Sequence, residues 1–305
     1  MKLNKIKLAL CGLIGIGMVA SSQAQTLKYN WNINNASGTG AGLTIAPSGG
    51  NGTLGTLTPL ANSGAAFSTP AGSGLSGGAS DLGLVSATPY RSAAGVIGGT
   101  LGDLTSINTA GGFTVSLWFD LNASATSFGS LNGGALNARL FDIASTSAGD
   151  GDRLFFSLNT GTNIQVGVNT ASTGPITTIS PFGNLAASPA TLTNNWIFVA
   201  VSYTTAAGGT ANIFEGTQTG AATLVSTLTG VGNLAWDASG DVALVGNRGA
   251  GDRGLPGTID NVSLYSGAGD LSFVDGVQNI PEPTTVAVLG LGSLAGILAL
   301  RRRRN

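Results

Sequence analysis

The chain has no histidine, and its single cysteine, Cys11, lies near its start. Without histidine or a second cysteine, the sequence offers no Ser-His-Asp or Cys-His catalytic arrangement and no histidine-bound metal site. Charged residues are also scarce, at 9% of the chain. The polar surface must therefore consist mainly of Ser, Thr, Asn and Gly, a composition that indicates an extracellular all-β domain rather than a helical bundle.

A secretory signal peptide accounts for the position of Cys11. Three lysines precede an apolar run at residues 8–20, and the small residues of Ser22-Gln23-Ala24 suit signal peptidase. We expect cleavage between Ala24 and Gln25. Cleavage removes Cys11, so the mature protein can have neither a disulfide nor a thiol nucleophile.

The charge balance of the remaining chain argues against two classes of partner. Between Gln25 and Asn279, six basic residues stand against thirteen acidic ones, a net charge of −7, whereas the whole chain has −1. An acidic, lysine-poor exterior is unsuited to nucleic acid or to an anionic membrane surface.

Short apolar segments separated by Gly, Asn and Asp recur along residues 25–279 and predict β-strands. Residues 113–121, FTVSLWFDL, form the clearest one, and the apolar run at 194–203 predicts a strand buried on both faces. The other predicted strands span residues 27–33, 140–143, 153–158, 164–168, 211–215, 222–228, 241–245 and 258–265. Between residues 34 and 112, Leu82-Gly83-Leu84-Val85 and Val96-Ile97 favour short strands with long loops over a disordered linker. The pattern predicts one all-β domain, a two-sheet antiparallel jelly-roll sandwich.

Three of these segments resemble the LamG-like, or concanavalin A-like, jelly-roll family. They are FTVSLWF at 113–119, NWIFVAVSY at 195–203 and GTIDNVSLY at 257–265. The resemblance implies a module of a class that often binds carbohydrate or protein and sometimes holds calcium. Fold alone does not establish function.

Calcium is the single candidate cofactor. Asp150 and Asp152 lie in one Gly-rich turn and Asp252 lies in another, and oxygen ligands on flexible loops suit calcium. Asp260 joins them through its position in the family pattern. The alternative is that the turn aspartates are simply solvated and that Asp260 is a structural hydrogen-bond acceptor.

A carbohydrate site needs an exposed aromatic ring beside polar groups. Trp236 lies in a turn-like segment and is the best candidate, followed by Tyr90. Trp118 and Trp196 lie within apolar strands, so we expect them in the core.

Catalysis is not expected. Family glycoside hydrolases carry a Glu-x-Asp-x-x-Glu pattern, whereas Glu215 is the only glutamate between Gln25 and Asn279. The pairs Asp150/Asp152 and Asp237/Asp241 could in principle supply the two carboxyls that a glycosidase needs, but both lie in Gly/Ser-rich turns.

The last part of the chain has three parts in a fixed order. Pro281-Glu282-Pro283 is extended, the apolar run at 286–300 can form one helix, and a basic cluster follows. The cluster consists of Arg301, Arg302, Arg303 and Arg304. The apolar run is shorter than the roughly 20 residues that span a bilayer, and the arginines place the C-terminus in the cytoplasm.

This tail resembles the PEP-CTERM sorting signal of Gram-negative bacteria. The resemblance covers residues 281–305 and implies recognition by an exosortase and a link to exopolysaccharide or biofilm matrix. We expect a transient inner-membrane anchor, followed by transfer to the cell surface or the extracellular matrix. The alternative is an ordinary tail anchor.

Three functions therefore remain open. The first is a non-enzymatic matrix protein whose domain, at residues 25–279, binds exopolysaccharide or another matrix polymer. The second is a purely structural matrix or coat component that associates with itself. The third is a divergent glycoside hydrolase.

Overall fold

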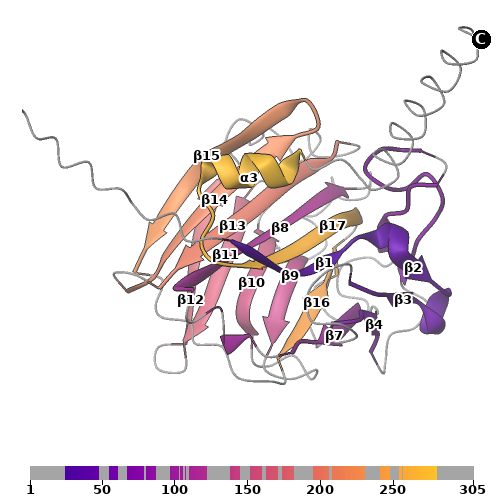
Figure 1. The fold of residues 1–305 in the computed structure, drawn as a ribbon, viewed down its shortest axis with the longest axis horizontal. Helices are drawn as coiled ribbons and strands as arrows, with labels where there is room; N and C mark the ends of the chain where they lie inside the picture. The colour runs from indigo at the N-terminus through magenta and orange to yellow at the C-terminus, as the bar shows by residue number, and fades with distance from the viewer. Residues whose placement is uncertain are drawn as a thin grey trace, which may run out of the picture.

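The computed structural model in Figure 1 describes the greater part of the domain between the predicted signal peptide and the sorting tail. The described residues are 25–47, 55–60, 67–78, 80–86, 97–102, 104–105, 107, 110–121, 138–144, 152–159, 163–170, 174–181, 195–205, 208–230, 241–247, 254–255 and 257–279.

Two antiparallel sheets make up the fold (Figure 1). The eight-stranded sheet has the order β15 (Gly220–Thr229), β14 (Thr210–Thr217), β13 (Ile197–Thr204), β8 (Gly112–Leu121), β17 (Gly257–Ser266), β6 (Leu84–Ser86), β5 (Phe67–Ser68), and β1 (Thr26–Trp31) also pairs with β17. The seven-stranded sheet has the order β12 (Gly174–Pro181), β11 (Asn163–Thr170), β10 (Asp152–Asn159), β9 (Ala138–Ala144), β16 (Val242–Val245), β7 (Ile97–Thr100), β4 (Thr58–Pro59).

These strands confirm the predicted all-β sandwich. Every strand predicted from residue 113 onward is present, and β13 is buried over seven of its eight residues, as its continuous apolar sequence predicts. The strands β4 to β7 confirm the prediction that the first third of the chain contains short strands rather than a disordered linker. The strand β12 was not predicted, because it has a proline near each end and proline is unusual within strands.

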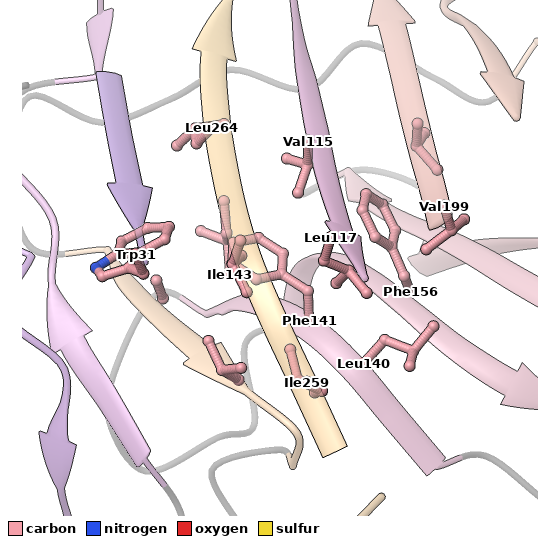
Figure 2. Packing of buried hydrophobic residues seen from close by; sticks show 14 of the residues in the cluster. Trp31, Val115, Leu117, Leu140, Phe141, Ile143, Phe156, Val199, Ile259 and Leu264 are labelled. Carbon is pink, nitrogen blue, oxygen red and sulfur yellow. The ribbon is translucent and has the colours of Figure 1, made fainter. Parts of the chain in front are cut away.

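One large apolar core lies between the two sheets (Figure 2). The side chains of Val115 and Leu117 come from β8 in one sheet, and those of Phe141 and Ile143 come from β9 in the other. Each buried side chain of this size contributes about 1.5–3 kcal/mol relative to exposure. Since the sequence has no cysteine after Cys11, this packing is the main source of stability that the domain offers.

The first strand is anchored in this core by two aromatic residues. Tyr29 and Trp31 stack with ring centroids 5.3 Å apart, and both are fully buried. The indole Nε1 of Trp31 donates to the Gly55 carbonyl over 2.6 Å, and the Tyr29 hydroxyl accepts the Gly102 N–H over 2.8 Å. Since buried polar groups need partners, these bonds let the two rings fill the core.

A smaller loop region extends the chain beyond β1. It contains the 3₁₀ turns η1 (Ile33–Asn35) and η2 (Gly40–Gly42) and a two-stranded sheet of β2 (Ala36–Ser37) and β3 (Thr44–Ile45). Figure 1 shows this region at the side of the molecule opposite β15.

The helix α3 (Leu271–Gln278) packs on the outer face of the eight-stranded sheet, and its sequence position was not predicted as helical. Asp270 caps it by accepting the Phe273 N–H over 2.9 Å. Its residue Val274 is fully buried in a second apolar cluster that contains Trp118, Phe198 and Phe214. Within the described residues, no helix has the length and apolar character that a membrane crossing requires.

Candidate functional site

Most of the predicted site residues lie outside the described residues. These are Ala24, Tyr90, Asp150, Trp236, Asp252, Pro281, Glu282, Pro283, Arg301, Arg302, Arg303 and Arg304. The backbone of Asp152 is described, and it differs from the expected turn: Asp152 is the first residue of β10 and pairs with Ala144. The structure therefore tests the geometry of two predicted site residues, Gln25 and Asp260.

Gln25, the predicted first residue of the mature chain, contacts the end of the domain. Its Nε2 donates to the Ala268 carbonyl over 2.9 Å. Cleavage after Ala24 would leave this contact in place. The cleavage position itself stays a prediction.

Asp260 lies in β17 and is fully buried. Its Oδ2 accepts the Leu75 N–H over 3.0 Å and its Oδ1 accepts the Asn261 N–H over 2.7 Å. The pairing of β17 with β8 is irregular between Asp260 and Ser263, and Asn261 has a positive φ of 49°. This bulge turns the carboxylate toward the loop around Leu75, so Asp260 fastens that loop to the sheet.

A second buried carboxylate holds the same loop. Asp81 accepts the Ser76 N–H over 2.5 Å and the Asn34 Nδ2–H over 3.0 Å. The Asn34 Oδ1 in turn accepts the Leu82 N–H over 2.6 Å. Gly74 is required here, because a Cβ at this position would lie 2.4 Å from the Asp81 Cγ.

These contacts give both aspartates a structural role that sequence did not assign to Asp81. The only sequence signal was an acidic residue within a Gly/Ser-rich loop. Among the side chains that the structure describes, no three acidic residues gather in a way that could hold a metal ion. The calcium role of Asp260 stays a prediction.

A buried charge pair occupies the seven-stranded sheet, on the face opposite the main core. The Arg139 Nε lies 3.4 Å from the Asp142 Oδ2, and the two side chains are 2% and 0% exposed. The Arg139 guanidinium carbon lies 3.5 Å from the centroid of the Phe155 ring. Such a stacked cation adds a cation–π attraction to the ion pair.

A bulge in β9 brings the two charges together. Strand side chains alternate by two, so residues three apart should point to opposite faces. Phe141 pairs with Phe156 and Arg139 pairs with Ser157, which leaves Leu140 as an extra residue in β9. Because Leu140 and Phe141 both enter the core, Arg139 and Asp142 share the other face.

The Phe155 ring beside the Arg139–Asp142 pair has room to lie there because β11, two strands from β9, has a glycine opposite it. Gly167 of β11 lies opposite Phe155, and a Cβ at Gly167 would lie 2.1 Å from ring atoms of Phe155. The ring therefore extends over β11, beneath the guanidinium. This arrangement was not predicted from the sequence, although two charged residues in the apolar segment ARLFDIA were a signal of it.

Three of the four tryptophans are placed and serve packing. Trp31 lies in the main core, Trp118 is 5% exposed in the cluster under α3, and Trp196 packs partly buried against that cluster. The buried position expected for Trp118 is confirmed, whereas Trp196 precedes β13 and is only partly buried. Trp236 and Tyr90 stay predictions as ligand-contacting residues.

A buried tyrosine, Tyr265, contacts the α3 residue Phe273. The Tyr265 ring meets the Phe273 ring edge-on, with centroids 5.1 Å apart. Burial raises the pKa of the Tyr265 hydroxyl, and its hydrogen bond with Ser263 lowers the pKa in part. Tyr265 is therefore neutral throughout the ordinary pH range.

A family model confirms the resemblance seen in the sequence. The model of the concanavalin A-like lectin/glucanases superfamily, named Laminin_G_3, matches residues 97–270, which is more than half of the chain. The chain belongs to this superfamily. The matched part contains β7 to β17, which are five strands of the eight-stranded sheet and six strands of the seven-stranded sheet.

A second model matches the PEP-CTERM protein-sorting motif over residues 279–304. This confirms the interpretation of the C-terminal tail. The protein is thus a superfamily member that carries a PEP-CTERM motif, and the motif implies export, membrane-anchored sorting and processing by an exosortase.

Two solved structures are similar to this chain. The receptor-binding domain of botulinum neurotoxin type G matches with a TM-score of 0.51 at 12% identity and covers 84% of this chain and 51% of the toxin chain. Domain 4 of AbnA, a GH43 extracellular arabinanase from Geobacillus stearothermophilus solved with arabinotriose, matches with a TM-score of 0.49 at 14% identity, over 84% of this chain and 99% of that one.

The chain spans about half the length of the toxin domains that it matches. At such low identity the likeness to the type G domain shows the fold alone. No relative was found among curated proteins.

Proposed function

We propose that this protein is a non-enzymatic surface or extracellular-matrix component whose sandwich domain binds carbohydrate or another matrix polymer. One observation carries the proposal: a sandwich of the lectin/glucanase superfamily leads directly into a PEP-CTERM motif. The tail delivers the domain to the outside of the cell, where extended polysaccharides are the abundant partners. After a transient inner-membrane stage, the processed protein resides at the cell surface or in the matrix.

The geometry of Asp142 makes this residue unsuitable as a catalytic carboxylate. A retaining glycosidase needs two carboxyl groups about 5 Å apart that meet both substrate and water. Asp142, on a central strand of the seven-stranded sheet, is inaccessible to solvent and lies against Arg139. A carboxylate in this position is neutralised by its partner and cannot reach a substrate.

The charge of the domain supports a neutral polymer as the ligand. At −7 between Gln25 and Asn279, the domain would repel acidic polymers. Neutral glycans are bound by stacking on aromatic rings and by hydrogen bonds with Ser, Thr and Asn. Trp236 and Tyr90 are the predicted stacking residues, and Asp150, Asp152, Asp252 and Asp260 are the predicted calcium ligands.

A purely structural coat protein is the second candidate, favoured by the strand β15. This ten-residue strand is the last in the order of the eight-stranded sheet and carries neither charge nor proline. Natural edge strands usually carry such features to prevent pairing between molecules. A matrix protein that assembles through this edge would need no glycan.

Co-sedimentation distinguishes the two candidates. Residues 25–279, which contain every described strand and α3, would be mixed with the host's exopolysaccharide and a panel of insoluble glycans, with calcium or with a chelator. We expect saturable binding with no release of reducing sugar. Replacing Trp236 by Ala should weaken binding by about tenfold, or about 1.4 kcal/mol.

Asp-to-Asn variants test the calcium ligands. The double variant Asp150→Asn/Asp152→Asn should lose any binding that depends on calcium. The control Asp270→Asn removes one charge but keeps a residue that caps helices equally well, so it should bind normally. Absence of binding to every glycan would contradict the proposal and leave self-assembly, and release of sugar would show a glycosidase.

A further inference from the structure

The folded domain holds the chain up to the point where the sorting motif begins. The Gln278 Nε2 donates to the Thr217 carbonyl over 2.8 Å and to the Gly220 carbonyl over 2.7 Å. The Asn279 N–H donates to the Asp275 carbonyl over 3.2 Å and ends α3. The match to the sorting motif starts at this same Asn279.

Only Asn279 and Ile280 separate Gln278 from Pro281. Three Cα–Cα steps of 3.8 Å limit the distance from Gln278 to Pro281 to about 11 Å in any conformation. An enzyme that holds Pro281-Glu282-Pro283 must therefore approach the residues around Gln278. We call this surface, made of the turn Thr217–Gly220 together with Gln278 and Asn279, the exit corner.

The connection between Gln278 and Pro281 could lengthen only if α3 left the sheet, and the packing of α3 opposes this. Val274 is fully buried against Trp118, Phe198 and Ala222. The Asp275 Oδ1 also accepts the Ala222 N–H over 3.2 Å, which ties the helix to the backbone of β15. Releasing α3 would expose these groups and break the bonds of Gln278, so the folded domain keeps the exit corner beside the motif.

The exit corner is rigid and uncharged. The Gln218 Nε2 donates to the Leu75 carbonyl over 2.7 Å, which ties the turn to the loop that Asp260 holds. Gln218, Thr219 and Gly220 are exposed. None of the turn residues is ionisable, although the domain as a whole is acidic. A neutral polar surface can approach a membrane-embedded enzyme without repulsion from anionic lipids.

We propose that the exit corner is a docking surface for the exosortase, which contacts the turn Thr217–Gly220 while it holds the sorting motif. The proposal rests on the exosortase processing described above and adds to it the surface of the folded domain that the enzyme meets. Because the connection is short, the domain cannot move away from an enzyme that holds the motif. The enzyme must therefore contact the exit corner.

The test introduces bulk at the exposed turn of the full-length protein in its host. Thr219→Trp adds a large side chain at the exit corner. The matched control, Thr229→Trp, changes the same residue type at the opposite exposed end of β15, about 30 Å along a strand that rises ~3.3 Å per residue. Processing is followed by pulse labelling and the loss of the tail mass.

We expect Thr219→Trp to slow processing by about tenfold, or about 1.4 kcal/mol, and Thr229→Trp to leave it unchanged. Inserting about ten Gly and Ser residues between Asn279 and Ile280 adds roughly 18 Å of root-mean-square reach and should restore processing of Thr219→Trp. A normal rate for Thr219→Trp, or a defect that the insertion leaves in place, would overturn the docking surface.

The variant Pro281→Ala/Glu282→Ala/Pro283→Ala separates this inference from the function on which it rests. If this variant is still processed, exosortase sorting itself is wrong. If it remains unprocessed while Thr219→Trp is processed normally, sorting stands and only the docking surface is rejected.

Discussion

At the scale of single residues, the most informative feature is the buried pair of Arg139 and Asp142. Removing two charges from water costs several kcal/mol each, and their attraction repays this only when the geometry is good. Here the guanidinium also lies over the Phe155 ring, 3.5 Å from its centroid. We therefore expect the pair to contribute mainly to the alignment of β9 with β10 at their bulge, and little to the net free energy of unfolding.

The two charges should behave differently when removed singly and together. Arg139→Met leaves the Asp142 carboxylate buried without its cation and should lower the free energy of unfolding by about 3–5 kcal/mol. The double variant Arg139→Met/Asp142→Leu should recover most of that loss. Urea unfolding of residues 25–279 measures both, and a double variant as unstable as the single one would contradict this account.

The pair of Arg139 and Asp142 also shows which contacts cannot be predicted from the sequence. Its two members were visible in the sequence, but strand alternation assigns them to opposite faces. Only the extra residue Leu140 brings them together, and a bulge has no reliable sequence signature. The Asp260 bulge at Asn261 was hidden for the same reason.

At the scale of elements, long strands were predictable and short elements were not. The apolar runs of β8 and β13 specify their strands because both faces are buried. The helix α3 has eight residues, too few for its periodicity to stand out, and it depends on packing against the sheet. The loop around Leu75, which Asp81 and Asp260 hold, depends on contacts between residues that are distant in sequence.

The attachment of α3 to the β14–β15 turn can be tested at Gly216. A Cβ at this position would lie 2.4 Å from the Gln278 Oε1, so Gly216→Ala must displace the Gln278 amide. The loss of its two hydrogen bonds should cost about 1–2 kcal/mol. In a Gln278→Ala background the same substitution should cost much less, and equal costs in the two backgrounds, measured as a double-mutant cycle, would show that the contact is unimportant.

At the scale of the whole molecule, the domain and the tail are separate in composition but joined without a linker. The domain is acidic, whereas the positive charge of the tail is concentrated in its last residues. This division was readable from the sequence, because targeting segments are defined by order and composition. The ligand of the domain was not readable, because binding residues lie mainly on loops, whose arrangement in space the sequence does not specify.

Sorting should depend on the tail as a unit. Replacing Pro281-Glu282-Pro283 by three alanines allows the segment to become helical and should leave the full tail on the protein in the membrane fraction. Replacing Arg301 to Arg304 by alanines is the companion variant and should weaken retention at the membrane. Membrane fractionation with mass measurement checks both, and a released product of normal mass from the first variant would contradict the sorting role of the motif.

The pairing of β1 with β17 has a consequence for the timing of folding during export. Thr26 pairs with Ser266, so β1, the first strand of the domain, cannot pair until β17, its last strand, has also been exported. A chain that leaves the translocon N-terminus first presents β1 well before its partner exists, and contacts between such distant residues form slowly. Closure of the eight-stranded sheet therefore coincides with the arrival of the hydrophobic tail in the membrane. Until then, β1 is an unpaired strand that can aggregate.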